Sequence, residues 1–333
     1  MQNKEIRLAR RPTGMPTYDD FAFVETEVPE PREGEVLVRT LYISVDPYLR
    51  SRMRARRSYV PPFEVNEVIS SGGIGEIVES RSPAFKPGDI VTGMLGWRLY
   101  NVTKAAGLTK VDPRIPVTAA LGVLGMPGLT AYFGLLDIGQ PKAGETVLVS
   151  GAAGAVGVAV CQIAKIKGCR VVGIAGGEEK NRYICDKLGV DAAIDYKAGD
   201  ISVALREACP NGIDVYFDNV GGEVSDAALP LIRQGARIII CGQISIYNVD
   251  APDIGLRPQP YLLVNRAMMK GFIITDYMAR FADGVRELSQ WFAEGKLKNV
   301  ETIVEGFENT PKAFIGLFTG ENLGKQIVKV AAK

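Results

Sequence analysis

Residues 146–180, TVLVSGAAGAVGVAVCQIAKIKGCRVVGIAGGEEK, carry the pattern that decides the fold of most of this chain. A short apolar run at 146–150 leads into three glycines, and a second apolar run follows at 170–175. Between the runs lies an apolar face with helical spacing, formed by Val156, Val160, Ile163 and Ala164. The stretch therefore predicts a strand, a tight turn, a helix and a second strand.

The same alternation of apolar runs and helical stretches continues beyond this unit. Further runs occur at 192–195, 213–218, 236–241 and 269–274. Helical spacing fills most of the intervals between them. Six strands that alternate with helices predict an α/β domain over 126–299, built on a doubly wound, parallel, six-stranded Rossmann sheet.

The first 125 residues follow a different pattern. Strand-like segments at 35–45, 70–80 and 88–95 lie between clusters of Gly, Pro and Asp, with few helical periods. This predicts a mostly β domain, such as a partly open barrel. The tail at 321–333, ENLGKQIVKVAAK, again has the pattern of a strand, so we expect 300–333 to rejoin the domain formed by 1–125.

Charge and hydropathy exclude several classes of partner. The 333 residues carry 39 Lys and Arg against 38 Asp and Glu, so no overall basic field favours nucleic acid or an anionic membrane. No apolar stretch approaches the ~18–20 residues of a membrane span. The opening MQNKEIRLARRPTG is too polar for a signal peptide, so we expect a cytoplasmic protein.

The chain contains no histidine, which limits its chemistry. Ser-His-Asp and Cys-His catalysis in their usual form and zinc sites that need imidazole are excluded, and we expect no metal. The odd number of cysteines and the lack of a C-x-x-C pair indicate reduced, buried structural thiols. These cysteines are at positions 161, 169, 185, 209 and 241.

The glycine turn is typical of a dinucleotide site. Gly151 can form the tight turn, Gly154 can let the backbone approach a pyrophosphate, and Gly157 can let helix and strand pack closely. The N–H groups and positive end of the following helix would then face the phosphates. The spacing G-x-x-G-x-x-G departs from the more familiar G-x-G-x-x-G, so a glycine-rich turn without a ligand remains the alternative.

The end of the second predicted strand bears on which dinucleotide binds. NAD sites usually carry an acidic residue there to hold the ribose diol. Here the strand ends in two glycines at 176–177, and Lys180 follows at a distance from which it can pair with a 2′-phosphate. The spacing favours NADP as the cofactor. NAD stays an alternative because Glu178 lies close to the end of this strand.

Several motifs together resemble one known family. GAAGAVG (151–157), FDNVGG (217–222), CGQISIYN (241–248) and EGFENTPKAFIGLFTGENLGK (305–325) are similar to zinc-free medium-chain dehydrogenases/reductases of the leukotriene B4 12-hydroxydehydrogenase/prostaglandin reductase family. LYISVDPYLRSRM (41–53) and RRSYVPPFEVNEVI (56–69) are most similar to the bacterial curcumin reductase branch and to plant alkenal double-bond reductases. The resemblance extends over essentially the whole chain.

The resemblance implies a fold and an activity. The fold is a GroES-like, mostly β catalytic domain joined to the Rossmann domain, usually in a homodimer. The activity is the NADPH-dependent reduction of the carbon–carbon double bond of small α,β-unsaturated ketones and aldehydes. Such an enone is activated by its own carbonyl, so hydride can enter at the β-carbon without a metal and leave an enolate that needs hydrogen-bond donors.

The resemblance also implies the cofactor contacts. The phosphate loop is Ala152 to Val156, including Gly154 and Ala155, and Lys180 meets the 2′-phosphate. Tyr196 and Asn219 contact the adenosine and ribose regions. The residues implied around the nicotinamide half are Met126, Thr130, Cys241, Gly242, Ile244, Tyr247, Phe272, Ile273, Ile274 and Asn322. The chain has QISIYN at 243–248 where many relatives have Thr before the Tyr, which affects the expected shape of the pocket.

Tyr247 is the predicted catalytic donor to the enolate, a role that the cofactor's ribose hydroxyl would share. The alternative is that Tyr247 only packs on the cofactor. Tyr48 is a second candidate for the substrate pocket, and Asp46 before Pro47 is typical of a turn. Loop tyrosines at 59 and 261 are weaker candidates that could lie on the surface.

Two further questions stay open at the level of sequence. The cluster RSRMRARR (50–57) is interpreted as a solvated loop beside the active site, with a nucleic-acid patch or a steering site for an anionic substrate as alternatives. A quinone reductase and a non-catalytic NADPH-binding protein are the alternative functions. The motifs ISIYN and SVDPY weigh against the quinone reductase. A complete nicotinamide-side motif weighs against the non-catalytic binding protein.

Overall fold

A computed structural model describes residues 2–331, and the chain forms two compact units. One unit comprises 2–121, 301–322 and 326–331. The other comprises 122–300 with 323–325 and contains the glycine turn.

The glycine-turn unit is built on six parallel strands. They are β8 (Thr146–Ser150), β9 (Arg170–Ala175), β10 (Ala192–Asp195), β11 (Ile213–Asp218), β12 (Ile232–Ile240) and β13 (Met268–Gly271). Their spatial order is β10-β9-β8-β11-β12-β13, and every neighbouring pair is parallel. The predicted doubly wound, six-stranded sheet is therefore confirmed.

One predicted strand, 269–274, extends too far. β13 ends at Gly271, which is paired with Ile240, the last residue of its partner β12. Beyond Ile240, the Cys241 N–H donates to the Asp218 carbonyl at 2.9 Å, and the pairing with β13 ends. The chain after Gly271 leaves the sheet and begins a 3-10 turn at Ile274, where Asp276 accepts a hydrogen bond from the Ile273 N–H at 3.4 Å. Residues 272–274 thus follow the sheet instead of forming part of it.

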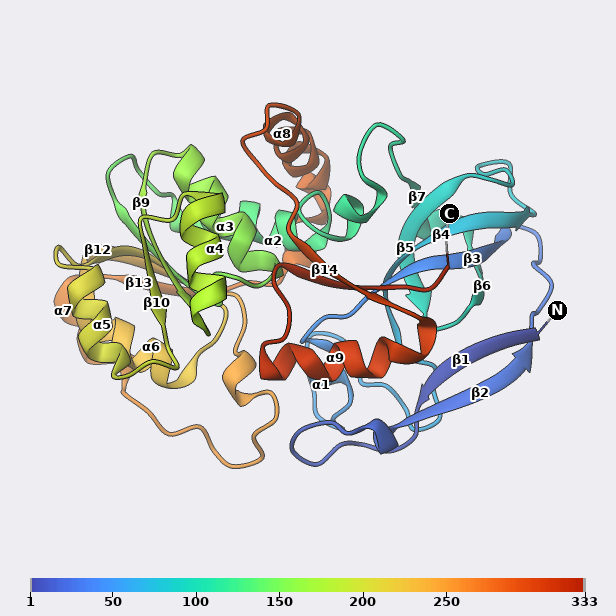
Figure 1. The fold of residues 1–333 in the computed structure, drawn as a ribbon, viewed down its shortest axis with the longest axis horizontal. Helices are drawn as coiled ribbons and strands as arrows, with labels where there is room; N and C mark the ends of the chain where they lie inside the picture. Colours follow the sequence, from blue (N-terminus) through green and yellow to red (C-terminus); the bar gives the residue numbers. More distant parts are fainter. Residues whose placement is uncertain (1, 332–333) are drawn as a thin grey trace. The chain divides into compact units, whose positions relative to one another are not determined.

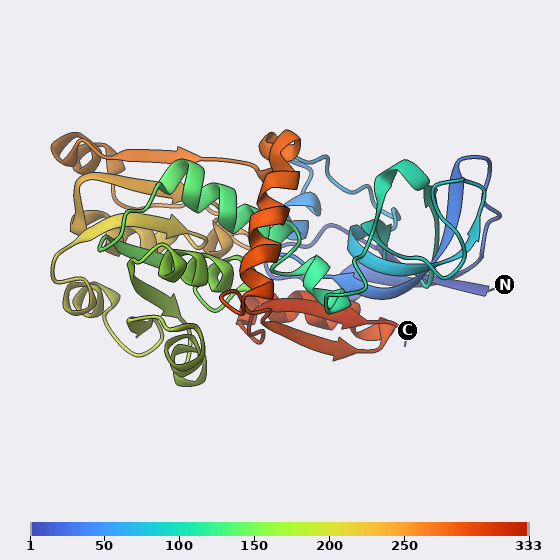
Figure 2. The ribbon, with the colours of Figure 1, turned by 90° about the horizontal axis from the view of Figure 1, so that it is seen from above.

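Helices cover both faces of this sheet (Figures 1 and 2). They are α2 (Met126–Phe133), α3 (Ala155–Ile166), α4 (Glu178–Leu188), α5 (Ile201–Ala208), α6 (Gly222–Ala228), α7 (Pro258–Asn265) and α8 (Phe281–Ala293). Right-handed crossovers place α3 and α4 on one face and α5, α6 and α7 on the other. All five residues of the central strand β8 are consequently buried, which explains the apolar run of its three middle residues, 147–149.

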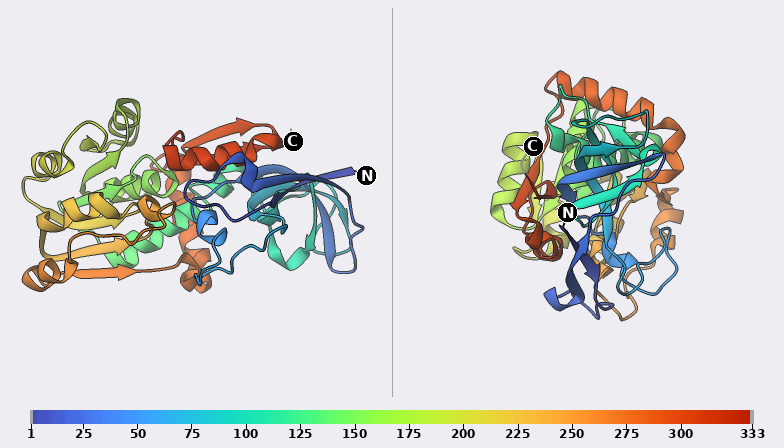
Figure 3. Two further views of the ribbon diagram at one scale, coloured as in Figure 1. Left: turned by 90° about the horizontal axis from the view of Figure 1, so that it is seen from below. Right: turned by 90° about the vertical axis from the view of Figure 1, so that its right-hand side faces the viewer.

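The other unit is mostly β, as predicted. Its strands are β1 (Gln2–Leu8), β2 (Phe21–Glu27), β3 (Glu35–Ser44), β4 (Ser70–Ser80), β5 (Ile90–Gly96), β6 (Tyr100–Lys104), β7 (Leu108–Lys110), β14 (Glu301–Glu305) and β15 (Lys325–Lys329). The main sheet has the order β14-β15-β3-β4-β5-β7, with β6 also on β3. β15, from the predicted C-terminal strand, pairs antiparallel with β3 (Figure 3).

Two helices complete this unit, α1 (Leu49–Arg52) and α9 (Thr310–Thr319). α9 contributes Phe314 to an aromatic cluster with Phe21 and Trp97, whose indole N–H donates to Ser71 Oγ at 2.9 Å. Short 3-10 or π turns across the chain are η1 (Tyr18–Asp20), η2 (Ala105–Gly107), η3 (Val117–Leu121), η4 (Gly134–Gly139), η5 (Leu229–Leu231), η6 (Ile244–Ile246), η7 (Ile274–Arg280) and η8 (Phe307–Asn309).

The arginine cluster is not a uniformly solvated loop, so that interpretation is wrong for two of its members. Arg50, on α1, is fully buried and donates to the backbone carbonyls of Pro12 and Gly14 at 3.2 and 2.8 Å. Arg52 stacks on the Phe63 ring, with its guanidinium carbon 3.7 Å from the ring centroid. α1 directs these side chains inward, where they hold the neighbouring loops together.

The two weaker tyrosine candidates lie in different surroundings. Tyr59 is 57% exposed, as expected of a surface loop. Tyr261 lies on helix α7 and packs against the apolar core of its unit, so its assignment to a loop is wrong. The apolar pattern PYLLV behind the proline is the helix signal that was missed.

Candidate functional site

The strand order creates a switch point in the six-stranded sheet. β8 and β11 are neighbours, but the chain leaves β8 toward β9 and leaves β11 toward β12, so the loops after β8 and β11 diverge. In open α/β sheets, ligands bind in the crevice at such a point, outside the carboxyl ends of the strands. Most predicted site residues follow these strand ends: Gly154, Ala155, Val156, Lys180, Tyr196, Asn219, Cys241, Gly242, Ile244, Tyr247, Phe272, Ile273 and Ile274.

The glycine turn after β8 leaves no room for side chains. A Cβ at Gly157 would lie 2.1 Å from the carbonyl oxygen of Gly151, and Gly151 itself has φ +59°. Gly154 is the N-cap of α3 and supplies no side chain to cap it, so the first N–H groups of the helix face outward from the turn. This is the cradle of backbone donors that a pyrophosphate requires.

Ala152 lies beneath this cradle. Its N–H already donates to the Ile174 carbonyl at 2.9 Å, and its methyl group is fully buried. A Cβ at Gly157 would also lie 2.8 Å from Ala152 Cα. Ala152 therefore packs under the turn. The N–H groups that face outward are those at the start of α3.

A cationic cluster lies at the ends of β9 and β10. A Cβ at Gly176 would lie 2.8 Å from the Tyr196 ring and 2.9 Å from the Lys197 side chain, so both side chains rest on this glycine. Burial, and then the charge of Lys197, lower the pKa of Lys180. Asp195 accepts from the backbone N–H groups of Gly177 and Lys197, each at 2.9 Å. Sequence reasoning missed Lys197, although it directly follows Tyr196 in the motif DYK.

Glu178 takes no part in this cluster in the described structure. Its side chain is 91% exposed and approaches Arg182, one turn along α4, at 3.9 Å. Glu178, the acidic residue that left NAD as an alternative cofactor, therefore faces solvent and Arg182.

Asp218, the last residue of β11, organises the neighbouring strand ends. Its carboxylate is fully buried. It accepts hydrogen bonds from Ser150 Oγ, Tyr216 Oη, the N–H groups of Val220 and Gly221, Ser225 Oγ and Gln243 Nε2. Because a buried carboxylate needs such partners, this network fixes the turns that follow β8, β11 and β12. Sequence reasoning missed this role, although an acid closing the apolar strand IDVYFD was a visible signal.

Asn219 is anchored on the neighbouring strand β8. Its backbone N–H donates to Ser150 Oγ and its side-chain amide to the Ser150 carbonyl, both at 2.8 Å. Its Cβ lies 3.5 Å from the position a Cβ would take on Gly151. The predicted ribose contact is therefore held directly beside the glycine turn.

Tyr247 follows the short turn η6 after β12. Its phenol oxygen accepts a hydrogen bond from the backbone N–H of Gln243 at 3.3 Å. Burial raises the pKa of Tyr247, an effect that this N–H partly offsets. The phenol is consequently neutral around pH 7 and keeps its proton for donation.

Cys241, at the start of the same segment, is not an activated thiol. Burial, and then the Asp218 charge, raise its pKa to about 12. All five cysteines are free thiols, and three of them, Cys161, Cys169 and Cys209, are buried, whereas Cys185 and Cys241 are half-buried. Full burial, as predicted, holds for three of the five, and the reduced state of the thiols stays a prediction.

Of the other predicted residues, Met126 and Thr130 lie on α2, Phe272 follows β13 and packs toward η4, and two more lie in the other unit. Met126 begins α2 and is 50% exposed, and the Thr130 hydroxyl donates to its carbonyl at 2.8 Å. Phe272 packs on Gly134, where a Cβ would lie 2.7 Å from its ring. Tyr48 and Asn322 belong to the mostly β unit. Burial, and then the charge of Asp46, raise the pKa of Tyr48.

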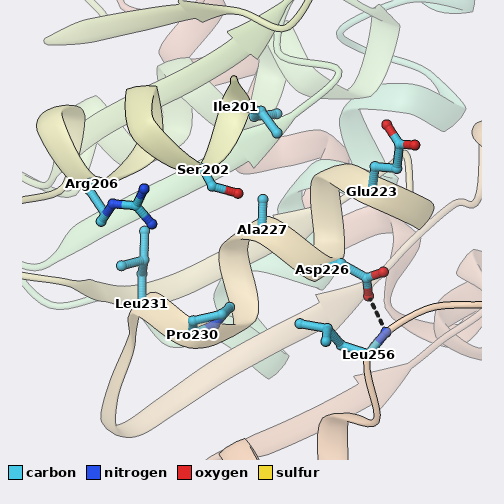
Figure 4. Close-up of a pocket in the computed structure, with 9 residues that line it drawn as sticks. All are labelled: Ile201, Ser202, Arg206, Glu223, Asp226, Ala227, Pro230, Leu231 and Leu256. Carbon is cyan, nitrogen blue, oxygen red and sulfur yellow. Dashed lines mark hydrogen bonds between the residues drawn. The ribbon is translucent and has the colours of Figure 1, made fainter. Parts of the chain in front are cut away.

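A pocket of about 380 Å³ lies elsewhere in the glycine-turn unit, between α5 and α6 (Figure 4). It is lined by Ile201, Ser202, Arg206, Glu223, Asp226, Ala227, Pro230, Leu231 and Leu256. Asp226 accepts the Leu256 N–H at 3.1 Å at its rim. This pocket contains none of the predicted site residues.

Family models match both parts of the chain. One described as the N-terminal domain of oxidoreductase matches residues 4–111, and one described as zinc-binding dehydrogenase matches 155–293. Within residues 2–331, three or more His, Cys, Asp or Glu side chains are nowhere grouped as a metal site. Across the same residues, no helix has the length and apolar character needed to span a membrane.

Named relatives and a solved structure match over nearly the full length. NADPH-dependent curcumin reductase of Escherichia coli (strain K12) is 46% identical over 99% of this chain and 97% of its own. Prostaglandin reductase 1 of Bos taurus is 43% identical over 98% of each. CurA from Vibrio vulnificus, solved in complex with NADPH, is 45% identical, covers 99% of this chain and 100% of its own, and has a TM-score of 0.94. By these matches, the chain belongs to the zinc-free medium-chain dehydrogenase/reductase family, as a relative of prostaglandin and curcumin reductases.

Proposed function

We propose that the protein is an NADPH-dependent reductase of the carbon–carbon double bond in α,β-unsaturated ketones and aldehydes. The observation that carries the proposal is the Tyr247 phenol, neutral and held by a backbone N–H, at the strand end next to the dinucleotide switch point. The relatives agree with it, because curcumin reductase is named as NADPH-dependent and curcumin itself contains enone groups.

The residues present fit NADP(H). The cradle formed by Gly151, Gly154 and Gly157 suits the pyrophosphate, since Gly151 has a positive φ and a side chain at Gly157 would collide with backbone. We propose that Lys180 and Lys197 hold the 2′-phosphate beside Tyr196, because a pair of ammonium groups that repel one another gains most from an anion between them. A homologous CurA structure contains NADPH, which supports this choice.

When bound, NADPH would supply the hydride that adds to the β-carbon of the substrate, and a proton from water would then add to the α-carbon to complete the saturated product. Between these two steps, negative charge accumulates on the substrate carbonyl oxygen, as an enolate. We propose that the Tyr247 O–H donates a hydrogen bond to this oxygen, with the cofactor ribose hydroxyl as a second donor. A neutral phenol suits this task because it stabilises the developing charge more than the neutral carbonyl of the ground state.

The other predicted contacts remain part of the proposal. The N–H groups of Ala155 and Val156 face the pyrophosphate, Asn219 a ribose, and Cys241, Gly242 and Ile244 the nicotinamide side. The residues assigned to substrate or to the rest of the nicotinamide pocket are Tyr48, Met126, Thr130, Phe272, Ile273, Ile274 and Asn322. The segments 1–125 and 300–333 would form the catalytic domain, and 126–299 the NADP-binding domain.

We also propose a homodimer, for which the edge of the six-stranded sheet offers a surface. β13 is an edge strand, and edge strands pair readily with another chain. On the adjoining α7, Leu263 and Val264 are 78% and 71% exposed. Large apolar side chains beside an open edge favour a second copy of the chain as their partner.

The proposed function is tested by following NADPH oxidation with a trans-2-alkenal, an open-chain enone, curcumin and a quinone, each repeated with NADH. Rapid oxidation with the enones and preference for NADPH are expected. Faster turnover of the quinone than of any enone would favour the quinone reductase alternative. NADPH binding without turnover of any substrate would favour a non-catalytic binding protein.

A further inference from the structure

Two turns lie side by side at the carboxyl edge of the six-stranded sheet. The turn 218–222 follows β11, and the turn 241–247 follows β12. The N–H groups of Cys241 and Gly242 donate to the Asp218 carbonyl at 2.9 and 3.1 Å, and the Ser245 N–H donates to the Val220 carbonyl at 3.1 Å. Backbone hydrogen bonds therefore join the turn that carries Asn219 to the turn that carries Tyr247.

The side chain of Gln243 fills the space between these turns. Its Nε2 donates to Asp218 Oδ2 at 3.3 Å and to the Gly242 carbonyl at 2.8 Å. Its Oε1 occupies the place of the missing side chain at Gly221, where a Cβ would lie 2.1 Å from it. Because the amide NH₂ group must face the Asp218 carboxylate, the orientation of this amide is fixed.

The backbone of the same residue holds the tyrosine. The Gln243 N–H donates to the Tyr247 oxygen at 3.3 Å, and a Cβ on the preceding residue, Gly242, would lie 3.6 Å from that oxygen. The phenol oxygen thus accepts from Gln243 while its own hydrogen is directed elsewhere. Accepting a hydrogen bond polarises the O–H and makes it a better donor.

We propose that Gln243 is a positioning residue for Tyr247: its side chain, clamped by Asp218 and seated over Gly221, fixes the backbone N–H that orients the phenol. This inference rests on the proposed function, in which Tyr247 donates to the enolate. It predicts that Gln243 influences catalysis through Tyr247 and has little effect on the affinity for NADPH.

A double-mutant cycle on the full-length protein tests this proposal. kcat/KM for an open-chain enone at saturating NADPH is measured for the wild type, Gln243→Leu, Tyr247→Phe and the double variant. Gln243→Leu removes the amide at similar volume and is expected to lower kcat/KM by about 3- to 10-fold, the size of one hydrogen bond. In the Tyr247→Phe background the same change is expected to cost less than about 2-fold, because no phenol remains to be oriented.

Ser245 provides the matched control in the same turn. Its hydroxyl donates to the Val220 carbonyl at 2.6 Å and has no part in holding the phenol. Ser245→Ala should therefore change kcat/KM by the same factor in the wild type and in the Tyr247→Phe variant. Gln243→Met enters the cycle alongside Gln243→Leu, so that the test does not depend on one variant folding. NADPH affinity, measured by fluorescence titration, is expected to change little in either Gln243 variant.

Two results would overturn the proposal and separate it from the proposed function. If Gln243→Leu and Gln243→Met slow the Tyr247→Phe enzyme by the same factor as the wild type, Gln243 acts independently of the phenol while the reductase function stands. If Tyr247→Phe turns over enones as fast as the wild type, the donor role fails, and the positioning role fails with it.

Discussion

The two ends of the candidate site are held by different kinds of interaction. At the phosphate end, residues 151–157 present backbone N–H groups; Gly151 is needed for its positive φ, and Gly157 because a Cβ would meet backbone. At the tyrosine end, residues 218–222 and 241–247 are joined by backbone hydrogen bonds and by the Gln243 side chain on the buried Asp218 carboxylate. The first end depends on local chain geometry, and the second depends on partners far apart in sequence.

This difference predicts different responses to mutation. A change at the phosphate end should distort the backbone and remove cofactor binding altogether. A change at the tyrosine end should leave the cofactor bound and slow the reaction, because the lost group acts on the substrate's developing charge.

The largest effect is expected for Gly157→Val. Its side chain would collide with the Gly151 carbonyl, 2.1 Å from the Cβ, so helix α3 must move away from β8. We expect loss of detectable NADPH binding and a fall in the free energy of unfolding of about 3 kcal/mol. Fluorescence titration and denaturant unfolding measure the two effects.

Gly107→Ala is the matched control, because no atom lies within 4 Å of its Cβ position and its φ requires no glycine. Its unfolding free energy should stay within about 0.5 kcal/mol of the wild type. Normal NADPH binding by Gly157→Val would show that the turn is not the phosphate cradle.

Tyr247→Phe should have the next largest effect, confined to turnover. Removing a donor to the enolate is expected to lower kcat about 100- to 1,000-fold while NADPH affinity stays near that of the wild type. Tyr18→Phe, which removes a hydroxyl that donates to the Glu308 carbonyl at 2.8 Å in the other unit, is the control and should retain full kcat. A small loss in Tyr247→Phe would assign the donor role to the cofactor ribose hydroxyl.

The lysine pair should determine the choice between the two cofactors. Lys180→Met is expected to raise the KM for NADPH about 10- to 100-fold, the size of a charged hydrogen bond, and to leave the KM for NADH unchanged. Lys197→Met should have a smaller effect in the same direction, because Lys197 is exposed. Parallel increases in KM for both cofactors would contradict the assignment of a 2′-phosphate site.

The same pair predicts a pH dependence. Because burial and Lys197 lower the pKa of Lys180, its positive charge is lost at a lower pH than that of an ordinary lysine. The ratio of NADPH to NADH affinity should therefore fall as pH rises through the lowered pKa. In Lys197→Met the repulsion is absent, so this fall should move to higher pH. An unchanged profile would show that the two lysines are not coupled.

The smallest effect on catalysis is expected at the sheet edge. Leu263→Asp should convert the proposed dimer into a monomer, because a charge replaces an exposed apolar contact beside the edge strand β13. Light scattering after size exclusion measures the mass, and kcat per subunit should change little. A monomeric wild type would contradict the proposed homodimer.

The phosphate end was predictable from sequence because its determinants are local. Strand, turn and helix follow one another within 146–166, and each of the three glycines has a steric reason that the pattern already contains. The strand positions of the Rossmann sheet were predicted for the same reason. The end of β13 was missed because Ile240, on another strand, decides where pairing stops.

The tyrosine end was predictable only in part. The resemblance identified Tyr247, but Asp218 and Gln243 were missed, since their 3.3 Å contact joins residues 25 positions apart. Lys197 was missed because its link to Lys180 arises only when β9 and β10 lie side by side. Arg50 was misjudged because no charge pattern shows that α1 turns it inward.

The most direct test of this account is the fate of the transferred hydrogen. NADPH carrying deuterium at the transferred position is incubated with the enzyme and an open-chain enone, and the product is analysed by NMR and mass spectrometry. Hydride transfer to the β-carbon predicts a saturated ketone that carries deuterium on that carbon. An allylic alcohol with deuterium on the carbinol carbon, or no product at all, would contradict it.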